Sequence, residues 1–280
     1  MSFTTRFAPS PTGPLHLGHA YSAILAHDRA RARGGRFLLR IEDIDRSRAR
    51  AEWEAQIYED LAWLGLSWEQ PVMRQSDRMD TYRAALDRLA ASGLLYPCSC
   101  TRRDIAQAMS APQEGVVGPD GPVYPGTCRG RPLSQAGPND ALRLHIGRAI
   151  AHLPTLPAFT ETGPIHPGDH ALRAEDLARS IGDVVLSRRG MGTSYHLSVV
   201  VDDAAQGVTE VTRGADLFDA TRIHVLLQSL LGLPHPTHHH HRLIRDATGR
   251  RLAKRDDARA IAAFRAEGAT PADIRAMIGL

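Results

Sequence analysis

Lysine is almost missing from this 280-residue chain: Lys254 is the only one, and arginine supplies the rest of the 34 basic residues. Apolar runs are short as well, and none approaches the roughly 20 residues that a membrane-spanning helix needs. The first residues contain no basic-then-apolar leader of the secretory type. These absences argue against a membrane or exported protein. We therefore expect a cytoplasmic protein with no membrane partner.

Cysteine is also scarce, and all three cysteines fall within the segment 98–128. An odd number of thiols cannot pair off fully as disulfides, and the cytoplasm keeps thiols reduced. Cys98, Cys100 and Cys128 can instead supply three of the four ligands of a tetrahedral zinc ion, with a structural role. The alternative is three unconnected buried thiols. The residues alone leave the fourth ligand open, and the candidates are a water, Tyr124, Asp104, Asp120 and the more distant His145.

The remaining composition is that of an ordinary soluble globular protein, with 42% hydrophobic and 23% charged residues. A formal net charge of +3 and an isoelectric point near 9.0 permit a nucleic-acid partner without requiring one. The length is enough for one large domain or two modest ones. A monomer is the default expectation.

The most informative segment is Pro9-Ser-Pro-Thr-Gly-Pro-Leu-His-Leu-Gly-His19, between a β-prone run and a long Ala-rich helical stretch. A helix N-terminus at this point offers backbone N–H groups to a polyphosphate, and Gly18 leaves room for a ring or a phosphate to approach. The imidazoles of His16 and His19 can donate to phosphate oxygens as charge develops during nucleotidyl transfer. The alternative is that the two histidines only cap the helix.

Strands and helices alternate along the first part of the chain, which favours a Rossmann-type, doubly wound parallel sheet in an α/β protein. The pattern predicts strands at 3–8 and 36–41 and helices at 17–33, 47–66 and 77–92. In the second part we expect strands at 141–146 and 183–187, a β-branched run at 197–201 and a helix at 217–231. The predicted division is 1–96 and 139–235 for the two halves of the catalytic domain, 97–138 for a zinc-binding insertion, and 236–280 for a lysine loop with a short helical segment.

A second basic motif, Arg250-Arg-Leu-Ala-Lys-Arg255, follows a turn at Gly249. Such a loop could close over phosphates, although a basic run is ordinarily a solvated surface. Because the only lysine lies there, we expect Lys254 to complete the nucleotide site. The run His238–His241 cannot place all four side chains on one metal ion, so we expect one or two of them to line the nucleotide pocket and the others to face solvent.

Both motifs resemble those of class I aminoacyl-tRNA synthetases: His16-Leu-Gly-His19 is similar to their first signature and Arg251-Leu-Ala-Lys-Arg255 to the second, Lys-Met-Ser-Lys-Ser. The segments 6–19 and 39–45 resemble the glutamyl branch in particular. Two positions depart from the family pattern, because Arg251 replaces a lysine and Ala253 a serine. The resemblance extends from Arg6 to Arg255 and implies use of ATP with Mg²⁺.

Only 25 residues follow Arg255, too few for the anticodon-binding region of a full glutamyl-tRNA synthetase. The chain thus resembles a truncated paralogue in the glutamyl branch, in which a tyrosine joins three cysteines on zinc; this resemblance selects Tyr124. It implies formation of glutamyl-adenylate without tRNA, and then transfer of glutamate to the cyclopentene ring of queuosine in the anticodon of tRNA(Asp).

The resemblance also implies roles for individual residues. The predicted catalytic residues are His16, His19 and Lys254. The predicted glutamate-binding residues are Arg6, Ser10, Glu42, Tyr195 and Arg213. The predicted ATP-binding residues are Ala8, Pro9, Ser10, His16, Gly18, His19, Arg251 and Lys254. The predicted zinc ligands are Cys98, Cys100, Tyr124 and Cys128.

Three other functions compete with this one. A compact glutamyl-tRNA synthetase would charge the 3′ end of tRNA. A nucleotidyltransferase shares the first motif but lacks the set Arg6, Glu42 and Arg213. A catalytically silent RNA-binding paralogue is favoured by Ala253, but the presence of both histidines and of Lys254 argues against it.

Overall fold

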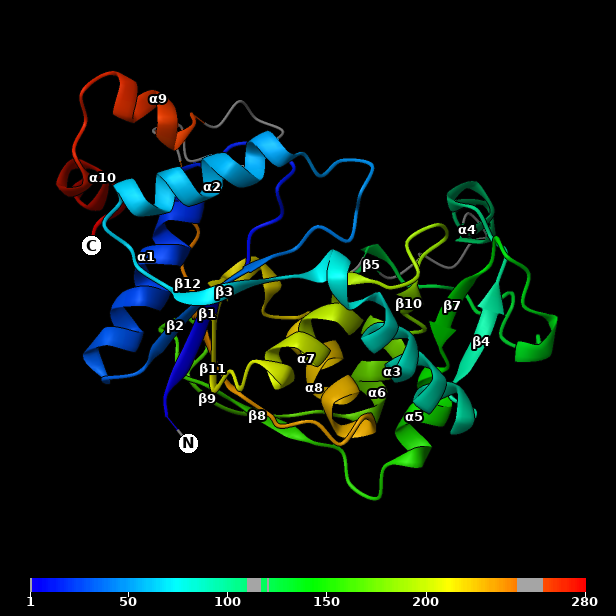
Figure 1. Ribbon diagram of the computed structural model, residues 1–280. Helices are drawn as coiled ribbons and strands as arrows, with labels where there is room; N and C mark the ends of the chain where they lie inside the picture. Colours follow the sequence, from blue (N-terminus) through cyan, green and yellow to red (C-terminus); the bar gives the residue numbers. More distant parts are fainter. Residues whose placement is uncertain (1, 110–116, 120, 246–258) are drawn as a thin grey trace.

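The first half of the chain builds a parallel three-stranded sheet with the order β1-β2-β3, formed by Thr4–Phe7, Arg36–Ile41 and Glu69–Arg74 (Figure 1). Two crossover helices connect these strands, α1 at Leu17–Ala32 and α2 at Ala51–Trp63. The computed structural model describes residues 2–109, 117–119, 121–245 and 259–280. The strand–helix alternation expected for 3–41 is confirmed, whereas β3 was not predicted.

A second group of strands continues this sheet beyond β1. Its order is β11-β12-β8-β9, formed by Glu210–Gly214, Thr237–His241, Ala158–Glu161 and Gly168–Ala171. The pairs β11–β12 and β12–β8 are parallel, and β9 is an antiparallel edge strand. The amide N–H of Thr209 donates to the carbonyl of Thr4 over 2.9 Å, which places β11 beside β1. Strand order therefore reverses between β1 and β11, and such a switch point is where doubly wound sheets bind ligands.

Helices cover both faces of the sheet, so two hydrophobic cores form. One contains α1 with the inward side chains of β1 and β2, and the other contains α3 (Met79–Ala91), α7 (Tyr195–Ala205) and α8 (Thr221–Leu230). Figure 1 shows α1 and α2 on one side of β1–β3, and α7 and α8 on the other. The doubly wound α/β fold is thus confirmed.

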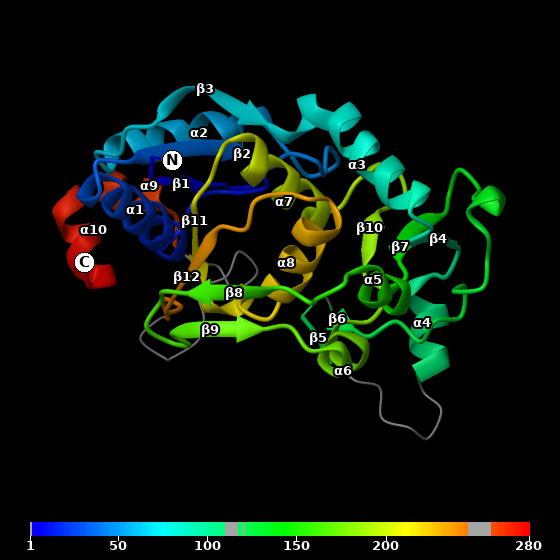
Figure 2. The same ribbon diagram turned by 90° about the horizontal axis from the view of Figure 1, so that it is seen from below.

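A smaller antiparallel sheet lies apart from the main one, with the order β10-β7-β4, formed by Val185–Ser187, Ala141–Leu144 and Leu95–Cys98. Helix α4 (Arg102–Met109) and the short pair β5 (Val117–Gly118) and β6 (Gly121–Pro122) extend from it. Two short helices, α5 (Ile146–His152) and α6 (Ala174–Asp176), lie between β7 and β10 in the chain. Figure 2 shows this region at the end opposite to the C-terminal helices. The predicted division into four segments stays a prediction.

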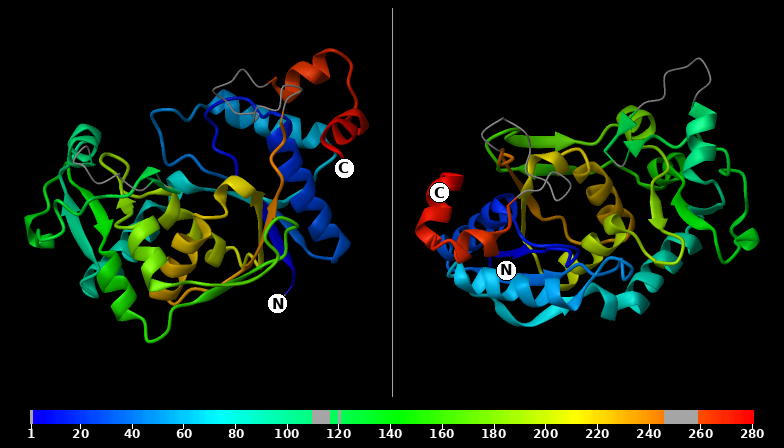
Figure 3. Two further views of the ribbon diagram at one scale, coloured as in Figure 1. Left: turned by 180° about the vertical axis from the view of Figure 1, so that it is seen from behind. Right: turned by 90° about the horizontal axis from the view of Figure 1, so that it is seen from above.

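The C-terminal helix α10 (Pro271–Ile278) packs beside α1, and Arg265 of α9 (Ile261–Ala266) lies 3.5 Å from Glu59 of α2 (Figure 3). A bidentate ion pair between Arg275 of α10 and Asp28 of α1 supports this contact, with N–O distances of 2.7 and 3.2 Å. No helix within the described residues has the length and apolar character needed to cross a membrane.

Residues 197–201 differ from what their composition suggests. A Leu-Ser-Val-Val-Val run is typical of strands, yet it lies inside α7. Ser194 caps this helix by accepting from the amide of Leu197 at 3.4 Å, and residues 196–203 are buried on all sides. Packing on every face outweighs the weak helix propensity of valine.

Candidate active site

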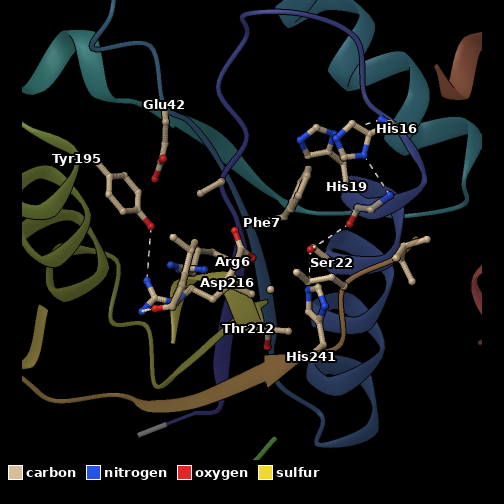
Figure 4. Close-up of a pocket in the computed structure, with 17 residues that line it drawn as sticks. Arg6, Phe7, His16, His19, Ser22, Glu42, Tyr195, Thr212, Asp216 and His241 are labelled. Atoms are coloured by element: carbon tan, nitrogen blue, oxygen red, sulfur yellow. Dashed lines mark hydrogen bonds between the residues drawn. The ribbon is translucent and has the colours of Figure 1, made fainter. Parts of the chain in front are cut away.

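A cavity of about 350 Å³ opens at the switch point, where β1, β11 and the N-terminus of α1 meet. Figure 4 shows Glu42 and Tyr195 on one side of it and His16 and His19 on the other. Eight residues that the sequence predicted for the site line this cavity: Arg6, Ala8, His16, Gly18, His19, Glu42, Tyr195 and Arg213. The structure therefore brings residues from both halves of the chain to one place.

The two motif histidines form the N-terminus of α1. Nδ1 of His16 accepts the amide N–H of Gly18 at 3.1 Å, and Nδ1 of His19 accepts the amide N–H of His16 at 3.2 Å. Their rings stack with centroids 3.8 Å apart. Because both Nδ1 atoms accept hydrogen bonds, each neutral ring carries its proton on Nε2, where it is a donor. The histidines therefore cap the helix and also line the cavity, so the two interpretations are compatible.

Gly18 has a further reason to be glycine, beside the expected room for a ligand. A Cβ at this position would lie 3.1 Å from Nδ1 and Cε1 of the His16 ring. That contact is tighter than side chains ordinarily tolerate. Gly18 thus makes room for the capping imidazole of its own helix, while it also lines the cavity.

Arg6 is part of a buried ion cluster, which we call the switch-point ion cluster: Arg6, Arg40, Glu42 and Asp203. Arg6 donates to both Asp203 oxygens at 2.9 and 3.2 Å, and Arg40 donates to Asp203 at 2.7 Å and to Glu42 at 3.1 Å. Burial would raise the pKa of Asp203, but the two arginines lower it to about 2. Burial raises the pKa of Glu42, although Arg40 and Arg6 oppose the rise. The motif had not identified Arg40 or Asp203.

Arg213 comes from β11, opposite Tyr195 at the start of α7. Its Nη1 lies 3.5 Å from the Tyr195 hydroxyl. Figure 4 labels Tyr195 and draws a dashed line from its hydroxyl. Burial lowers the pKa of Arg213 and raises that of Tyr195. The pair therefore enters the cavity as a cationic donor beside a protonated hydroxyl.

Other predicted residues are placed differently. Pro9 and Ser10 precede α1 but are not among the cavity-lining residues; the Pro9 carbonyl accepts the amide of Glu42 at 3.0 Å. Arg251 and Lys254 lie outside the described residues, between 245 and 259. Both flanks of that interval adjoin the histidine motif: Ile244 lines the cavity, and the amide of Ile261 donates to the Leu15 carbonyl at 2.8 Å.

The histidine run was predicted only in part. All four residues of His238–His241 are buried in β12, so the expectation that some face solvent is wrong. The strand is paired on both edges, by β11 and β8, while Thr221 of α8 contacts His240 and Tyr21 of α1 contacts His241. His241 lines the cavity, and its Nε2 lies 2.7 Å from the Ser22 hydroxyl. Sequence reasoning also missed eight further lining residues: Phe7, Ser22, Thr212, Gly214, Asp216, Leu217, Leu243 and Ile244.

The three cysteines form a second polar cluster together with Tyr124, which we call the thiol cluster. The sulfur atoms of Cys98, Cys100 and Cys128 all lie within 4.8 Å of one another. The Tyr124 hydroxyl lies 3.4 Å from the Cys98 sulfur and 3.3 Å from the Cys100 sulfur, and it accepts the amide N–H of Cys128 at 2.8 Å. Sulfurs on one tetrahedral zinc lie about 3.8 Å apart, given Zn–S bonds of about 2.3 Å. The donor set and its spacing fit a bound metal.

The other candidates for a fourth ligand are engaged elsewhere or not described. Asp104 accepts from the amide and hydroxyl of Thr101 at 2.7 and 2.9 Å. His145 caps α5 by accepting from the amide of Arg148 at 3.2 Å. Asp120 lies outside the described residues. Tyr124 is therefore the oxygen donor that contacts the thiols among the residues compared.

Comparison with known proteins agrees with this architecture. Residues 2–130 and 168–280 match the catalytic domain of the class I tRNA synthetases (E and Q). The chain superposes on a glutamate-tRNA synthetase from Elizabethkingia anophelis with a TM-score of 0.79 and 24% identity. That superposition covers 99% of this chain and 61% of the other, and at this identity it supports the fold. The chain thus belongs to the class I tRNA synthetases of the glutamyl and glutaminyl type.

Two curated relatives narrow the assignment. The glutamyl-Q tRNA(Asp) synthetase of Rhodobacter capsulatus is 67% identical over 280 residues, which is 99% of each chain. The enzyme of the same description from Methylococcus capsulatus is 42% identical over 260 residues, covering 91% of this chain and 77% of its own. Within its class, this chain belongs to the glutamyl-Q tRNA(Asp) synthetase family.

Proposed function

We propose that the protein activates L-glutamate with ATP in the absence of tRNA and then transfers the glutamyl group to queuosine in the anticodon of tRNA(Asp). One observation carries the proposal: a single cavity joins the two imidazoles at the N-terminus of α1 to a pocket that contains two arginines and a buried carboxylate. A substrate with two carboxylates and one ammonium group matches that pocket in charge.

In the first step a carboxylate oxygen of glutamate attacks the α-phosphorus of ATP, and the bond to the β-phosphate breaks, so that pyrophosphate leaves. Because the attacking carboxylate is already ionised, no general base is required. Nε2–H of His16 and of His19 would donate to the ATP phosphates, and Lys254 with Arg251 would neutralise the leaving pyrophosphate. Mg²⁺ would accompany the ATP.

Glutamate itself would be held on the other side of the cavity. Two of the five guanidinium N–H groups of Arg6 are used on Asp203, and the other three can serve a substrate carboxylate. Glu42 would pair with the substrate ammonium, and Tyr195 would donate its hydroxyl. Ser10 stays a predicted contact. Loss of Arg213 should leave a carboxylate unpaired and weaken transition-state binding by about 2–5 kcal/mol.

In the second step a hydroxyl oxygen on the queuosine cyclopentene ring attacks the carbonyl carbon of glutamyl-adenylate. An ester forms, AMP leaves, and the hydroxyl proton passes to solvent. The modified anticodon loop has to enter the cavity for this reaction, and proteins commonly recognise such unstacked loop bases.

We further propose that Cys98, Cys100, Cys128 and Tyr124 hold one zinc ion with a structural role.

Glutamate-dependent exchange of pyrophosphate into ATP without tRNA tests the first step. We expect exchange from the wild-type protein and a large loss of turnover in Lys254→Ala. Replacement of the exposed Arg83 of α3, in Arg83→Ala, is the control. Absence of exchange in the wild type would contradict activation, and an unchanged Lys254→Ala rate would contradict the role of that lysine.

Mapping of labelled glutamate on tRNA(Asp) tests the second step. We expect label in the anticodon fragment and transfer that periodate abolishes when it cleaves the cis-diol of the modified base. Label at the 3′ end would instead identify a compact glutamyl-tRNA synthetase. A protein that binds the tRNA without either label would be a silent paralogue.

A further inference from the structure

The two arginines of the pocket have opposite surroundings. Arg6 is neutralised by a bidentate bond to Asp203. Within the described residues, no carboxylate forms an ion pair with Arg213; its neighbours are neutral acceptors. Four of its five N–H groups are held by protein acceptors. Nε donates to His240 at 3.0 Å and Nη1 to His224 at 3.0 Å, while Nη2 donates to Thr221 Oγ1 of α8 at 2.7 Å and to the Leu217 carbonyl at 3.2 Å. The fifth is directed at the Tyr195 hydroxyl in the cavity.

The bond from Arg213 determines which nitrogen of His240 carries the proton. A guanidinium can only donate, so Nε2 of His240 must accept, and the proton of the neutral ring lies on Nδ1. Nδ1 in turn donates to Oε2 of Glu161, a residue that is 3% exposed at the end of β8. Burial opposes ionisation of Glu161, but the hydrogen bonds from His240 hold its pKa below the usual range.

Glu161 is itself held in one orientation. Its Oε1 accepts two backbone amides, from Gly163 at 2.6 Å and from His240 at 2.9 Å. A Cβ on Gly163 would lie 2.3 Å from the His240 carbonyl oxygen and 2.6 Å from Oε1, so only glycine allows this turn. Oε2 is consequently left for the imidazole.

A second buried histidine chain supports the same guanidinium. Nδ1 of His224 accepts from Arg213, so its proton lies on Nε2, which donates to Nδ1 of His196 at 3.1 Å. Burial lowers the pKa of His224 well below its usual value and thereby keeps the ring neutral. Neither series of hydrogen bonds, through His240 or through His224, places an anion in contact with Arg213.

We infer that Glu161, acting through His240, is a positioning residue for glutamate binding: it fixes the imidazole tautomer that holds the Arg213 guanidinium against the cavity. The carboxylate of Glu161 contacts His240 and not Arg213. The positive charge of Arg213 is therefore available to a substrate carboxylate. This inference rests on the proposed activation of glutamate. It adds to that function two residues that line no part of the cavity.

An isosteric substitution separates the tautomer from simple packing. In Glu161→Gln the amide oxygen should stay on the two backbone donors, so the amide NH₂ group faces His240 Nδ1. That nitrogen must then accept, and the proton moves to Nε2, against Nε–H of Arg213. Nε2–H of His240 and Nε–H of Arg213 would then face each other as two donors. Arg213 would lose this hydrogen bond, which holds its guanidinium in place.

Steady-state pyrophosphate exchange gives the first readout. For Glu161→Gln we expect the KM for glutamate to rise on the order of tenfold to a hundredfold, with the KM for ATP within about twofold of wild type. Glu210→Gln is the matched control, because Glu210 is equally buried but bonds Arg29 from the surface of α1. A KM for glutamate that stays within twofold of wild type in Glu161→Gln would overturn the inference.

Nitrogen-15 NMR of the imidazoles gives a second readout that a packing defect would not move. We expect His240 to be protonated on Nδ1 in the wild type and on Nε2 in Glu161→Gln; an unchanged tautomer overturns the inference even if the KM rises. If that variant does not fold, His240→Gln and His240→Met decide. Glutamine keeps an acceptor for Arg213 and should keep the KM within about threefold, whereas methionine should raise it about tenfold, and equal values contradict the inference.

Different results would contradict the proposed activation of glutamate and the inferred role of Glu161. A wild-type protein without glutamate-dependent exchange contradicts the proposed function and the inference with it. Wild-type exchange combined with a normal glutamate KM in Glu161→Gln contradicts the inference alone.

Discussion

The two polar clusters of this molecule differ in what completes them. The switch-point ion cluster sets two arginines against two carboxylates, so its charges balance inside the protein. The thiol cluster gathers three sulfurs and a phenol, donors that hold a cation but cannot neutralise one another. In the switch-point ion cluster, each side chain pairs with a side chain of opposite charge, so the cluster needs no further ion. The donors of the thiol cluster gain their stability from a bound metal ion. The ion cluster should therefore be intrinsic to the fold, and the thiol cluster conditional on metal.

Breaking the ion cluster should have the largest effect. Asp203→Asn leaves two buried arginines without a shared carboxylate, so we expect the free energy of unfolding to fall by about 3–5 kcal/mol. Denaturant titration measures this. Asp80→Asn, which breaks an exposed pair with Arg83, is the control and should cost less than about 1 kcal/mol. An equal loss in both variants would show that burial of the cluster is irrelevant.

Removal of metal should affect only the thiol cluster. A metal present at 100 times its Kd stabilises the folded state by about 2.7 kcal/mol, which a chelator would remove. Hydrogen exchange after chelation should rise in β4 and near Cys128 but not in β1 or β2. Equal acceleration in all of these segments would contradict the independence of the two clusters.

Acid should weaken the ion cluster within a defined window. The pKa of Asp203 is about 2 when folded and near 3.9 when unfolded, so its stabilisation is complete above the unfolded value and is lost as pH falls towards the folded value. We expect the wild type to lose about 2 kcal/mol of its advantage over Asp203→Asn between about pH 5 and pH 2. Unfolding free energies of both proteins across this range provide the test. A constant difference would show that Asp203 does not titrate with the cluster.

The smallest change concerns one oxygen of the thiol cluster. Tyr124→Phe removes the hydroxyl that contacts two sulfurs, and we expect metal affinity to fall about tenfold while the fold persists. Competition with a chromogenic chelator measures the affinity. Tyr58→Phe removes a hydroxyl bonded to Glu54, away from the cluster, and should leave affinity unchanged.

Local sequence was a good guide where one segment contains its own information. The β1–α1–β2 unit follows from alternation and from the turn before His16, and Gly18 matters because its space is filled by a residue two positions away. The strands β8, β9 and β11 escaped prediction because each is five residues or fewer. β8 and β9 pair with each other across a short connection, whereas β11 lies beside β1, which is remote in the chain.

The sequence by itself determined the chemistry at hand: two histidines before a helix, a single lysine, three cysteines, and enough matching motifs to indicate the class. The tertiary structure decided which side chains meet as ion pairs or hydrogen-bond partners. Asp203 meets Arg6 across 197 residues, and Glu161 meets His240 across 79. Neither pair has a local pattern, because ion pairs and hydrogen bonds depend on distance in space, which only the folded sheet fixes.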